Sequence, residues 1–548
     1  MKNYMKLFQM SLVMLSVVFL ASCSTEKSNL TAVPNDAGFV MVIDGKAINE
    51  KGNINSLSES KAYKKVLAEF SDEQLQDFEQ FEYIFKDIEE SGIAINDEFI
   101  AFVKMVEGEP VIGFNFLVLD KSKIDALFQK VIDKEEDLTI INEDGISFFT
   151  KEQAIIAWSE QQLLVLTESG VVEDVLINNA KALLKQSADQ SISSNDTYSD
   201  FYAKKKDVSV WFNYDLFLNN MPPAQQMMLA SSMPFSMKGT YFYAYISFEK
   251  GEVIAEYESI MNDEMKKYMK EYKLINDDFD ADVLKMLPAT SYANMEMSIN
   301  VFDYYHMFLD MYKEKQVDTD VYIKQAEEEL GVTIDELLNS FSGEMAITMH
   351  GIHMAEKTAM DYSIDENGEF AMTEVTSTEP ELLYSAIIKY NNDIVWNIIE
   401  ERAAEMGMQK QDGYYSIAAA NISIAYINST MFITNDIDLL NKVVADGSVA
   451  PNMKSTEVAK HLGNFPTYME LNMDLDEYPE DVKLYIQQEA KEGSDAIFKF
   501  LSTYKRLQVI PNDIYSAKII LELKDDSKNS LEVILNNIDE TADLISQN

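Results

Sequence analysis

The sequence ISFFTKEQAIIAWSEQQLLVLTESGVVEDVL, residues 146–176, decides the fold, because a related sequence follows about 268 positions later. Residues 414–444 read YYSIAAANISIAYINSTMFITNDIDLLNKVV. In both copies, short alternating apolar runs precede apolar residues at helical spacing, and this pattern predicts three strands and a helix. Ser169 and Asp436 are the expected N-caps of the two helices.

The two copies align residue by residue over most of their length. Ala157 falls on Ala425, whereas residues 164–167 fall on residues 431–434 only after a one-residue change in the turn. Such agreement over several strands indicates an internal duplication.

The flanking segments of the two copies also correspond, in the same order. The matching segments are 33–43 and 287–299, 114–119 and 383–388, 124–131 and 394–399, and 212–216 and 471–475. Each copy is expected to end in a hairpin, formed by 241–248 with 253–257 and by 517–523 with 531–535. We therefore expect an α+β fold of two tandem homologous halves, each a mainly antiparallel sheet covered by helices.

The length of 548 residues exceeds what one hydrophobic core usually serves, which agrees with at least two domains. The expected domains are residues 33–272 and 283–548. The acidic stretch between them contains Asp278, Asp280 and Asp282.

The amino-terminal residues have the pattern of a bacterial lipoprotein signal. An apolar run at 7–20 follows two lysines, and Leu20-Ala21-Ser22 precedes Cys23, the single cysteine of the chain. The run is shorter than the roughly 20 residues of a spanning helix, although an ordinary cleaved signal or a short anchor remains an alternative. We expect residues 1–22 to be a signal peptide, Cys23 to carry the lipid and residues 23–32 to form the tether.

The composition restricts the partners. The chain has 93 acidic and 45 basic residues, a formal net charge of −48. Nucleic acids and anionic headgroups are bound by clustered lysine and arginine, so neither is an expected partner. The acidic surface could attract cations, but it would also simply keep the protein soluble beside a membrane.

The residues after the lipobox resemble a known family. Residues 33–44, VPNDAGFVMVID, resemble the opening of a Bacteroidota lipoprotein family catalogued as domain of unknown function 4836. The resemblance implies a cell-envelope lipoprotein and brings no activity, ligand or catalytic residue with it.

The segment around residue 367 partly fits a calcium-binding loop. Ser363, Asp365 and Asn367 alternate as oxygen donors, and Glu374 could coordinate with both oxygens. However, the first position holds serine where aspartate is expected, and Asn367-Gly368 is a hairpin turn signal. We favour a hairpin and expect no metal or other cofactor.

Catalytic and zinc motifs are weak. His350 and His353 are spaced for a shared metal on a helix, but their surroundings alternate like a strand, which would point the two rings to opposite faces. The chain contains neither a Gly-x-Ser-x-Gly turn nor a glycine-rich phosphate loop. The catalytic question stays open, and the sequence favours a protein that is not an enzyme.

The methionine-rich segment 221–230 is the most unusual in composition. A core helix is the favoured interpretation, and a hydrophobic binding surface or a copper site are the alternatives.

These patterns favour an envelope lipoprotein with a binding or scaffolding role. The alternatives are glycan or ligand capture and, with less support, an envelope hydrolase. Glycan capture is disfavoured because two of the three tryptophans, Trp158 and Trp211, fall in apparent core strands; Trp396 falls in an apolar helical stretch. The partners are the membrane, through the lipid on Cys23, and an unknown envelope protein or small ligand.

Residues next to the lipid bear on location. Ser24 stands where an aspartate often favours retention in the inner membrane, so the outer membrane is expected. Surface export in such lipoproteins tends to accompany an acidic cluster after the cysteine, and here Glu26 stands alone beside Lys27. The periplasmic face is therefore favoured over the cell surface.

Overall fold

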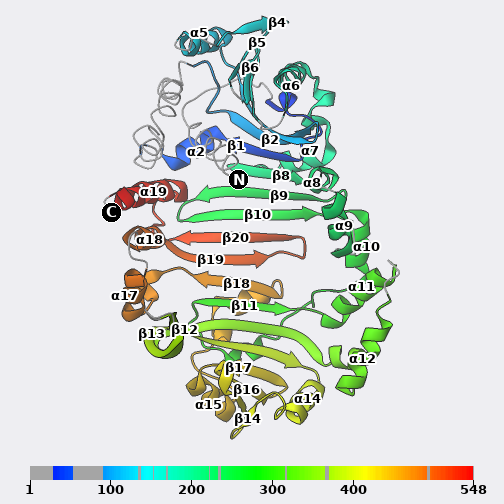
Figure 1. Ribbon diagram of the computed structural model, residues 1–548, viewed down its shortest axis with the longest axis vertical. Coiled ribbons are helices and arrows are strands. Elements are labelled where there is room, and N and C mark those ends of the chain that lie inside the picture. The colour runs from blue at the N-terminus through cyan, green and yellow to red at the C-terminus, as the bar shows by residue number, and fades with distance from the viewer. Residues whose placement is uncertain are drawn as a thin grey trace. The chain divides into compact units, whose positions relative to one another are not determined.

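The computed structural model describes residues 29–53, 64, 91–133, 138–151, 153–167, 171–220, 223–232, 236–314, 318–364, 370–489 and 494–546. The expected signal peptide, Cys23 and most of the tether lie outside these residues. The chain forms two compact units. Unit 1 comprises residues 1–263 and 522–547, and unit 2 comprises residues 264–521. Figure 1 labels the elements of both.

Unit 1 is built on an antiparallel sheet. Its strands are β1 (Phe39–Asp44), β2 (Glu98–Val106), β3 (Glu109–Leu117), β4 (Ile141–Glu143), β5 (Ile146–Lys151), β6 (Ala154–Trp158), β7 (Gln162–Thr167), β8 (Val208–Asn213), β9 (Tyr241–Glu249) and β10 (Glu252–Ile260). Neighbouring strands pair in the order β4, β5, β6, β7, β3, β2, β1, β8, β9, β10.

Helices cover both faces of this sheet. They are η1 (Asn29–Ala32), α2 (Gly45–Gly52), α5 (Lys121–Ile132), α6 (Glu173–Lys185), η4 (Ala188–Gln190), η5 (Ile192–Ser194), α7 (Asp196–Tyr202), α8 (Tyr214–Asn220), α9 (Pro223–Ser232) and α19 (Ser530–Ser546). Val40 and Val42 point into a core with α6 and α7. Ile43 lies in a second core, shared with α2, α5 and α19, against which Met41 packs. Strand alternation thus supplies apolar side chains to two covered faces.

Unit 2 is built on a second antiparallel sheet. Its strands are β11 (Ala293–Ser298), β12 (Phe341–Ile364), β13 (Phe370–Tyr390), β14 (Gln409–Lys410), β15 (Tyr415–Ile417), β16 (Ile422–Ile427), β17 (Thr430–Thr434), β18 (Thr467–Asn472), β19 (Tyr504–Pro511) and β20 (Ser516–Leu523). The pairing order is β14, β15, β16, β17, β13, β12, β11, β18, β19, β20.

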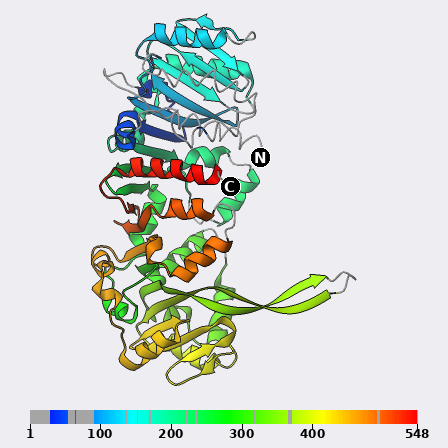
Figure 2. The ribbon, with the colours of Figure 1, turned by 90° about the vertical axis from the view of Figure 1, so that its left-hand side faces the viewer.

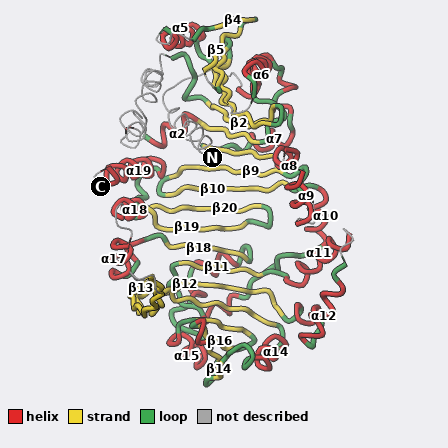
Figure 3. The backbone as a smooth tube through the Cα atoms, in the orientation of Figure 1, coloured by secondary structure: helices red, strands yellow, loops and turns green. Residues whose placement is uncertain are grey.

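Helices lie on both faces of the unit 2 sheet. They are α10 (Asp263–Glu271), η6 (Ala281–Met286), α11 (Val301–Glu314), α12 (Asp320–Leu330), α13 (Ile334–Leu338), α14 (Ile394–Arg402), η7 (Ala418–Ala420), α15 (Ile437–Asp446), η8 (Met453–Ser455), α16 (Glu457–Leu462), η9 (Leu475–Glu477), α17 (Glu480–Glu489) and α18 (Ser494–Leu501). Helix α14 packs against Ile424 of β16, and α15 packs with Ala425 on the other side of that strand. The largest core of the unit joins η6, η8, α15 and α16 to the sheet, and we call this side the α15/α16 face. Figure 3 separates strands from helices by colour.

The two halves share one topology. Ala157 in β6 lies opposite Leu164 in β7, and Ala425 in β16 lies opposite Phe432 in β17. Leu164 therefore corresponds to Phe432, and the predicted one-residue change in the turn is wrong. The expected α+β fold, with a mainly antiparallel sheet and helices in each of two halves, is confirmed.

Local predictions succeeded where a side chain fixes the backbone. The Asp436 side chain accepts a hydrogen bond from the Leu439 N–H, as expected of the N-cap of α15. The prediction that Ser169 is the N-cap of the first helix is wrong, because α6 begins at Glu173 and Val172 is its N-cap; Ser169 itself lies outside the described residues. Asn213 and Asn472 end the equivalent strands β8 and β18, as the matching segments predicted.

The predicted terminal hairpin of the first half is confirmed, because the segments 241–248 and 253–257 pair in β9 and β10. The predicted terminal hairpin of the second half is wrong, because residues 531–535 lie in α19, whereas β20 pairs with β19. Leu531 and Leu535 are four residues apart and both pack in the same core of unit 1, which is helical spacing. A short apolar run without its neighbours does not distinguish a strand from such a helix.

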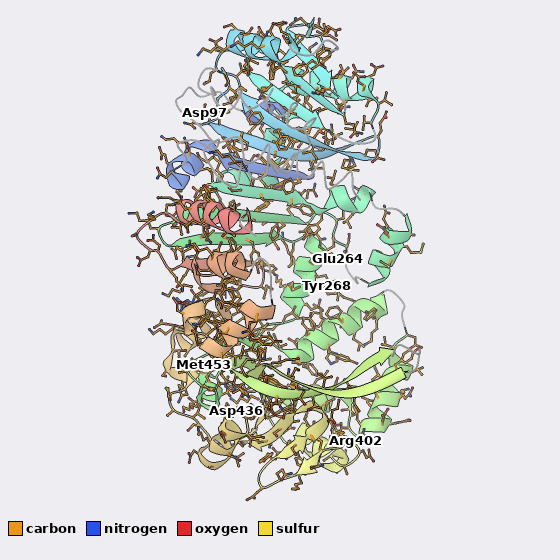
Figure 4. The ribbon with its side chains drawn as sticks, turned by 60° about the vertical axis from the view of Figure 1, so that its left-hand side comes forward. Asp97, Glu264, Tyr268, Arg402, Asp436 and Met453 are labelled. Carbon is orange, nitrogen blue, oxygen red and sulfur yellow. The ribbon has the colours of Figure 1, made fainter. Side chains whose placement is uncertain are left out.

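The unit boundaries differ from the expected ranges 33–272 and 283–548. Helix α10, at the end of the first half, belongs to unit 2, and α19, at the end of the second half, belongs to unit 1. On α10, whose Glu264 and Tyr268 are labelled in Figure 4, Met265 and Tyr268 are buried. The apolar side of α19 is buried in a core of unit 1, and its position in the sequence alone does not specify that unit.

Among the described residues, no helix combines the length and the hydropathy needed to cross a membrane.

Candidate functional site

The calcium-loop segment forms a hairpin, as favoured from its sequence. Ser363 pairs with Ala371 in the β12–β13 ladder, and Glu374 pairs with Met360. Asp365 and Asn367 lie outside the described residues. The proposed calcium ligands therefore have no described common site.

His350 and His353 both lie on β12 but have different partners. His350 Nε2 lies 3.0 Å from Ser385 Oγ, whereas His353 Nε2 lies 3.5 Å from Glu381 Oε2. Within the part of the chain that the structure describes, no group of three or more histidine, cysteine, aspartate and glutamate side chains is arranged to hold a metal ion.

Ser385, His350 and Asp436 form an arrangement that the sequence did not reveal. His350 Nδ1 lies 4.0 Å from Asp436 Oδ2, and Asp436 is labelled in Figure 4. The order of groups is that of a serine nucleophile with its base. However, Ser385 is fully buried and its hydroxyl donates to Thr434 Oγ1 at 2.9 Å. Burial also lowers the pKa of His350. A hydroxyl closed off from substrate is a structural group, so this trio does not support acyl transfer.

The methionine-rich helix α9 is not the core helix that we favoured. Met227 and Met228 are 75% and 68% exposed. The described residues before them, from Ala224 onward, are exposed as well. The core interpretation is therefore wrong for these side chains.

Two of the three tryptophans are closed to a sugar ring. Trp158 and Trp211 are fully buried, as expected. The ring of Trp396 stacks on Tyr426 with centroids 5.2 Å apart.

A row of polar side chains crosses the sheet of unit 2 on its α15/α16 face, each member directly opposite the next. From β16 to β19 the row comprises Ser423, Thr434, Ser385, Thr348, Asn294, Glu470 and Gln508. All are buried except Glu470, whose side chain is 17% exposed. We call this set the polar row.

The equivalent row of unit 1 is mostly apolar. It comprises Ile155, Leu166, Gly113, Phe102, Val40, Trp211 and Tyr243. Every member except Gly113 belongs to the core under α6 and α7. The fold therefore does not need polar side chains at these positions.

Glu296 lies beside the polar row, where unit 1 has Val42. It is 0% exposed, and neither carboxylate oxygen has a hydrogen-bond partner among the described residues. Burial, and after it the neighbouring Glu470, raise the pKa of Glu296 to about 9. A buried carboxyl without a partner is costly to the fold, and perturbed groups of this kind cluster at functional sites.

Glu470, in contrast, is compensated. Its Oε2 accepts from the Tyr468 hydroxyl at 2.6 Å, from Arg506 Nη1 at 3.3 Å and from Gln508 Nε2 at 3.3 Å. The His461 ring stacks on Tyr468 with centroids 4.7 Å apart. The arginine neutralises Glu470, so the uncompensated carboxyl of this cluster is that of Glu296.

Two further acceptors accompany Glu296. Asn294 Oδ1 and Thr348 Oγ1 are buried and receive no hydrogen bond from any described residue. The amide nitrogen of Asn294 donates to Ser291 Oγ at 2.9 Å, which leaves the oxygen directed away from that contact. This part of the core therefore presents oxygen acceptors.

The opposite face of the same strands is apolar and exposed. Large side chains that are 37–46% exposed lie there on β11, β12, β13 and β18: Met295, Ile347, Met349, Leu382 and Met469. Ile347 and Met469 each lie directly opposite Met295. In unit 1 the residue equivalent to Ile347 is Ala101, buried in the core with α5 and α19. We call this set the exposed apolar face.

A long hairpin extends from this sheet. Beyond Met349 and Tyr384, β12 and β13 pair with each other alone, residues 351–364 with residues 370–383. Figure 2 shows this two-stranded ribbon projecting past the other strands of unit 2. The equivalent hairpin of unit 1 turns at Glu107-Gly108, so the extension belongs to the second half.

Comparison with solved structures gives distant similarity. Crystal forms IV, III and I of TP0453 match at 9%, 8% and 8% identity, with TM-scores of 0.27, 0.25 and 0.24. They cover 45%, 47% and 47% of this chain and 86%, 92% and 90% of their own. Similarity at this level carries no argument about function.

No curated protein matches the chain. The model of one family, described as a domain of unknown function, does match, over residues 29–531. This span includes both sheets, the polar row and the exposed apolar face, and we conclude that the chain belongs to the DUF4836 family.

Proposed function

We propose that this protein is a cell-envelope lipoprotein that binds a partner protein through the exposed apolar face of unit 2 and has no catalytic role. The observation that carries the proposal is the exposure of Met295, Ile347 and Met469 on neighbouring strands. The corresponding side of unit 1 is covered by α2, α5 and α19.

The energetics favour a docking surface. Full burial of an exposed large aliphatic side chain is worth roughly 1.5–3 kcal/mol. Because the five side chains of the exposed apolar face are 37–46% exposed, covering each of them contributes less than half of that amount. Covering all five together still gives a partner a driving force. Contiguous exposed apolar patches mark interaction sites. Methionine suits such a surface because its flexible thioether adapts to different partner shapes.

The charge of the chain favours a protein over an anionic membrane as the occupant. Anionic leaflets attract lysine and arginine clusters, whereas this chain has a net charge of −48. A protein with an apolar patch surrounded by basic side chains has the complementary chemistry.

Location forms part of the proposal and rests on the sequence. The lipobox ending at Cys23 supports a lipid anchor, and Ser24 supports the outer membrane. The absence of an acidic cluster after the cysteine supports the periplasmic face. The family resemblance supports an origin in Bacteroidota.

Site-specific photo-crosslinking in cells tests the docking surface. A photoreactive residue at Met349 should give a discrete adduct, and one at Val321, which is 66% exposed on α12, should not. Adding Ile347→Asp and Met469→Asp should abolish the Met349 adduct. Equal adducts at Met349 and Val321, or an adduct that survives both aspartates, would contradict the proposal.

A further inference from the structure

We infer that unit 2 contains a site for a hard metal cation between β11 and β12, with oxygen ligands from Glu296, Asn294 and Thr348. This site lies on the α15/α16 face, so the inference is independent of docking on the exposed apolar face.

The register brings the three side chains together. Asn294 and Glu296 are two residues apart on β11 and so point to the same face, about 7 Å apart along the strand. Thr348 lies directly opposite Asn294, which places their Cβ atoms about 5 Å apart. Side chains of this length can direct their oxygens to one point between the strands.

The unpartnered atoms are all oxygens that can accept a hydrogen bond or coordinate a cation. They are the two oxygens of Glu296, Asn294 Oδ1 and Thr348 Oγ1. Asn294 and Thr348 are 4% and 1% exposed, so bulk water does not supply the missing donors. Carboxylate, amide and hydroxyl oxygens are the ligands that hard cations prefer.

The charges around the site favour a cation over neutral water. Glu470 is paired with Arg506, whereas neither carboxyl oxygen of Glu296 has a partner among the described residues. Water can donate hydrogen bonds to an ionised carboxylate but cannot neutralise it. A bound cation coordinates these oxygens and also neutralises the charge.

Unit 1 shows that the site is not a requirement of the fold. The residues equivalent to Asn294, Glu296 and Thr348 are Val40, Val42 and Phe102, all fully or almost fully buried. The same backbone positions thus form an apolar core in one half and a set of oxygen acceptors in the other.

Thermal unfolding with different ions tests the inference. The chelator-treated mature protein is compared in Na⁺, K⁺, Mg²⁺ and Ca²⁺ at matched ionic strength. We expect one of these ions to raise Tm by about 5–10 °C at a hundredfold excess over its Kd. Glu296→Gln should remove the shift, and Glu356→Gln, on the exposed part of β12, should retain it.

Isothermal titration calorimetry supplies a second readout. The ion that raises Tm should bind to the wild type, and Glu296→Val should bind no ion. The inference is overturned if no ion raises Tm more in the wild type than in Glu296→Gln, or if Glu296→Val binds the ion as the wild type does. Neither substitution at Glu296 changes the exposed apolar face. The crosslinked adduct at Met349 should therefore form in both variants even if the metal site proves wrong, which distinguishes failure of the metal site from failure of the proposed docking function.

Discussion

Unit 1 and unit 2 have the same strand order and register but opposite distributions of polarity. In unit 1, Val40 and Val42 face one apolar core and Met41 packs against another. In unit 2 the equivalent Asn294 and Glu296 face inward, and Met295 is 37% exposed. At these positions one half therefore has apolar side chains on both faces, while the other has a buried, unpartnered carboxyl inside and an exposed methionine outside. This difference locates the functional candidates in unit 2.

The largest effect is expected from copying the buried acid into the apolar half. Val42→Glu would place a carboxyl in a predominantly apolar core, and we expect it to destabilise unit 1 by about 5 kcal/mol or more. Urea unfolding followed by tryptophan fluorescence would measure this change, because Trp158 and Trp211 both lie in unit 1. An unchanged transition would show that the core of unit 1 tolerates acids as unit 2 does.

A matched pair of truncations tests the two rows. Phe102→Ala should cost unit 1 about 3–5 kcal/mol, because it leaves a cavity in a packed core. Thr348→Ala, at the equivalent position of unit 2, should change stability by less than about 1 kcal/mol, since its hydroxyl receives no hydrogen bond from the described residues. Similar losses for both variants would remove the contrast between the rows.

The pH dependence of unit 2 should reflect Glu296. In the unfolded chain this carboxyl loses its proton near its ordinary pKa of 4.5, but in the folded, ion-free protein it keeps the proton up to about pH 9. The folded state therefore binds more protons between these values, and its stability falls as pH rises, by at most about 1.4 kcal/mol per pH unit.

Glu296→Gln should flatten this slope. The groups that face or adjoin the carboxyl, namely Tyr468, Glu470, Arg506 and His461, stay in place in this variant. Denaturant unfolding across this pH range, followed through Trp396 of unit 2, measures the slope. An equal slope in the variant would assign the pH dependence to those neighbours.

The smallest effect on stability is expected on the exposed apolar face. Met295→Lys should change the free energy of unfolding by no more than about 0.5 kcal/mol, because the side chain already meets solvent. The equivalent Met41→Lys should cost about 1–3 kcal/mol, since Met41 packs against the core shared with α5 and α19. A large loss from Met295→Lys would indicate that this face is covered within the folded chain.

The sequence by itself determined the duplication, the fold class and many local features. Repeated alternation and helical spacing predicted β5, β6, β7 and α6 with their counterparts, because these periodicities follow from backbone geometry. The aspartate at position 436 predicted a helix start because its side chain can accept an N–H that the helix leaves unpaired. The core positions of Trp158 and Trp211 were also evident, since both lie in repeated apolar strands.

Only the tertiary structure decided which side of each strand is buried and which unit each terminal helix joins. The sequence of β11, ANMEMS, alternates methionine with polar residues and by itself suggests that the methionines face the core. Alternation defines two faces but does not say which one other elements cover. The neighbours β12 and β18, with η6, η8, α15 and α16 on the same side, bury Glu296 and leave Met295 exposed. The polar row draws its members from strands spread between residues 294 and 508, so their proximity exists only after the sheet has formed.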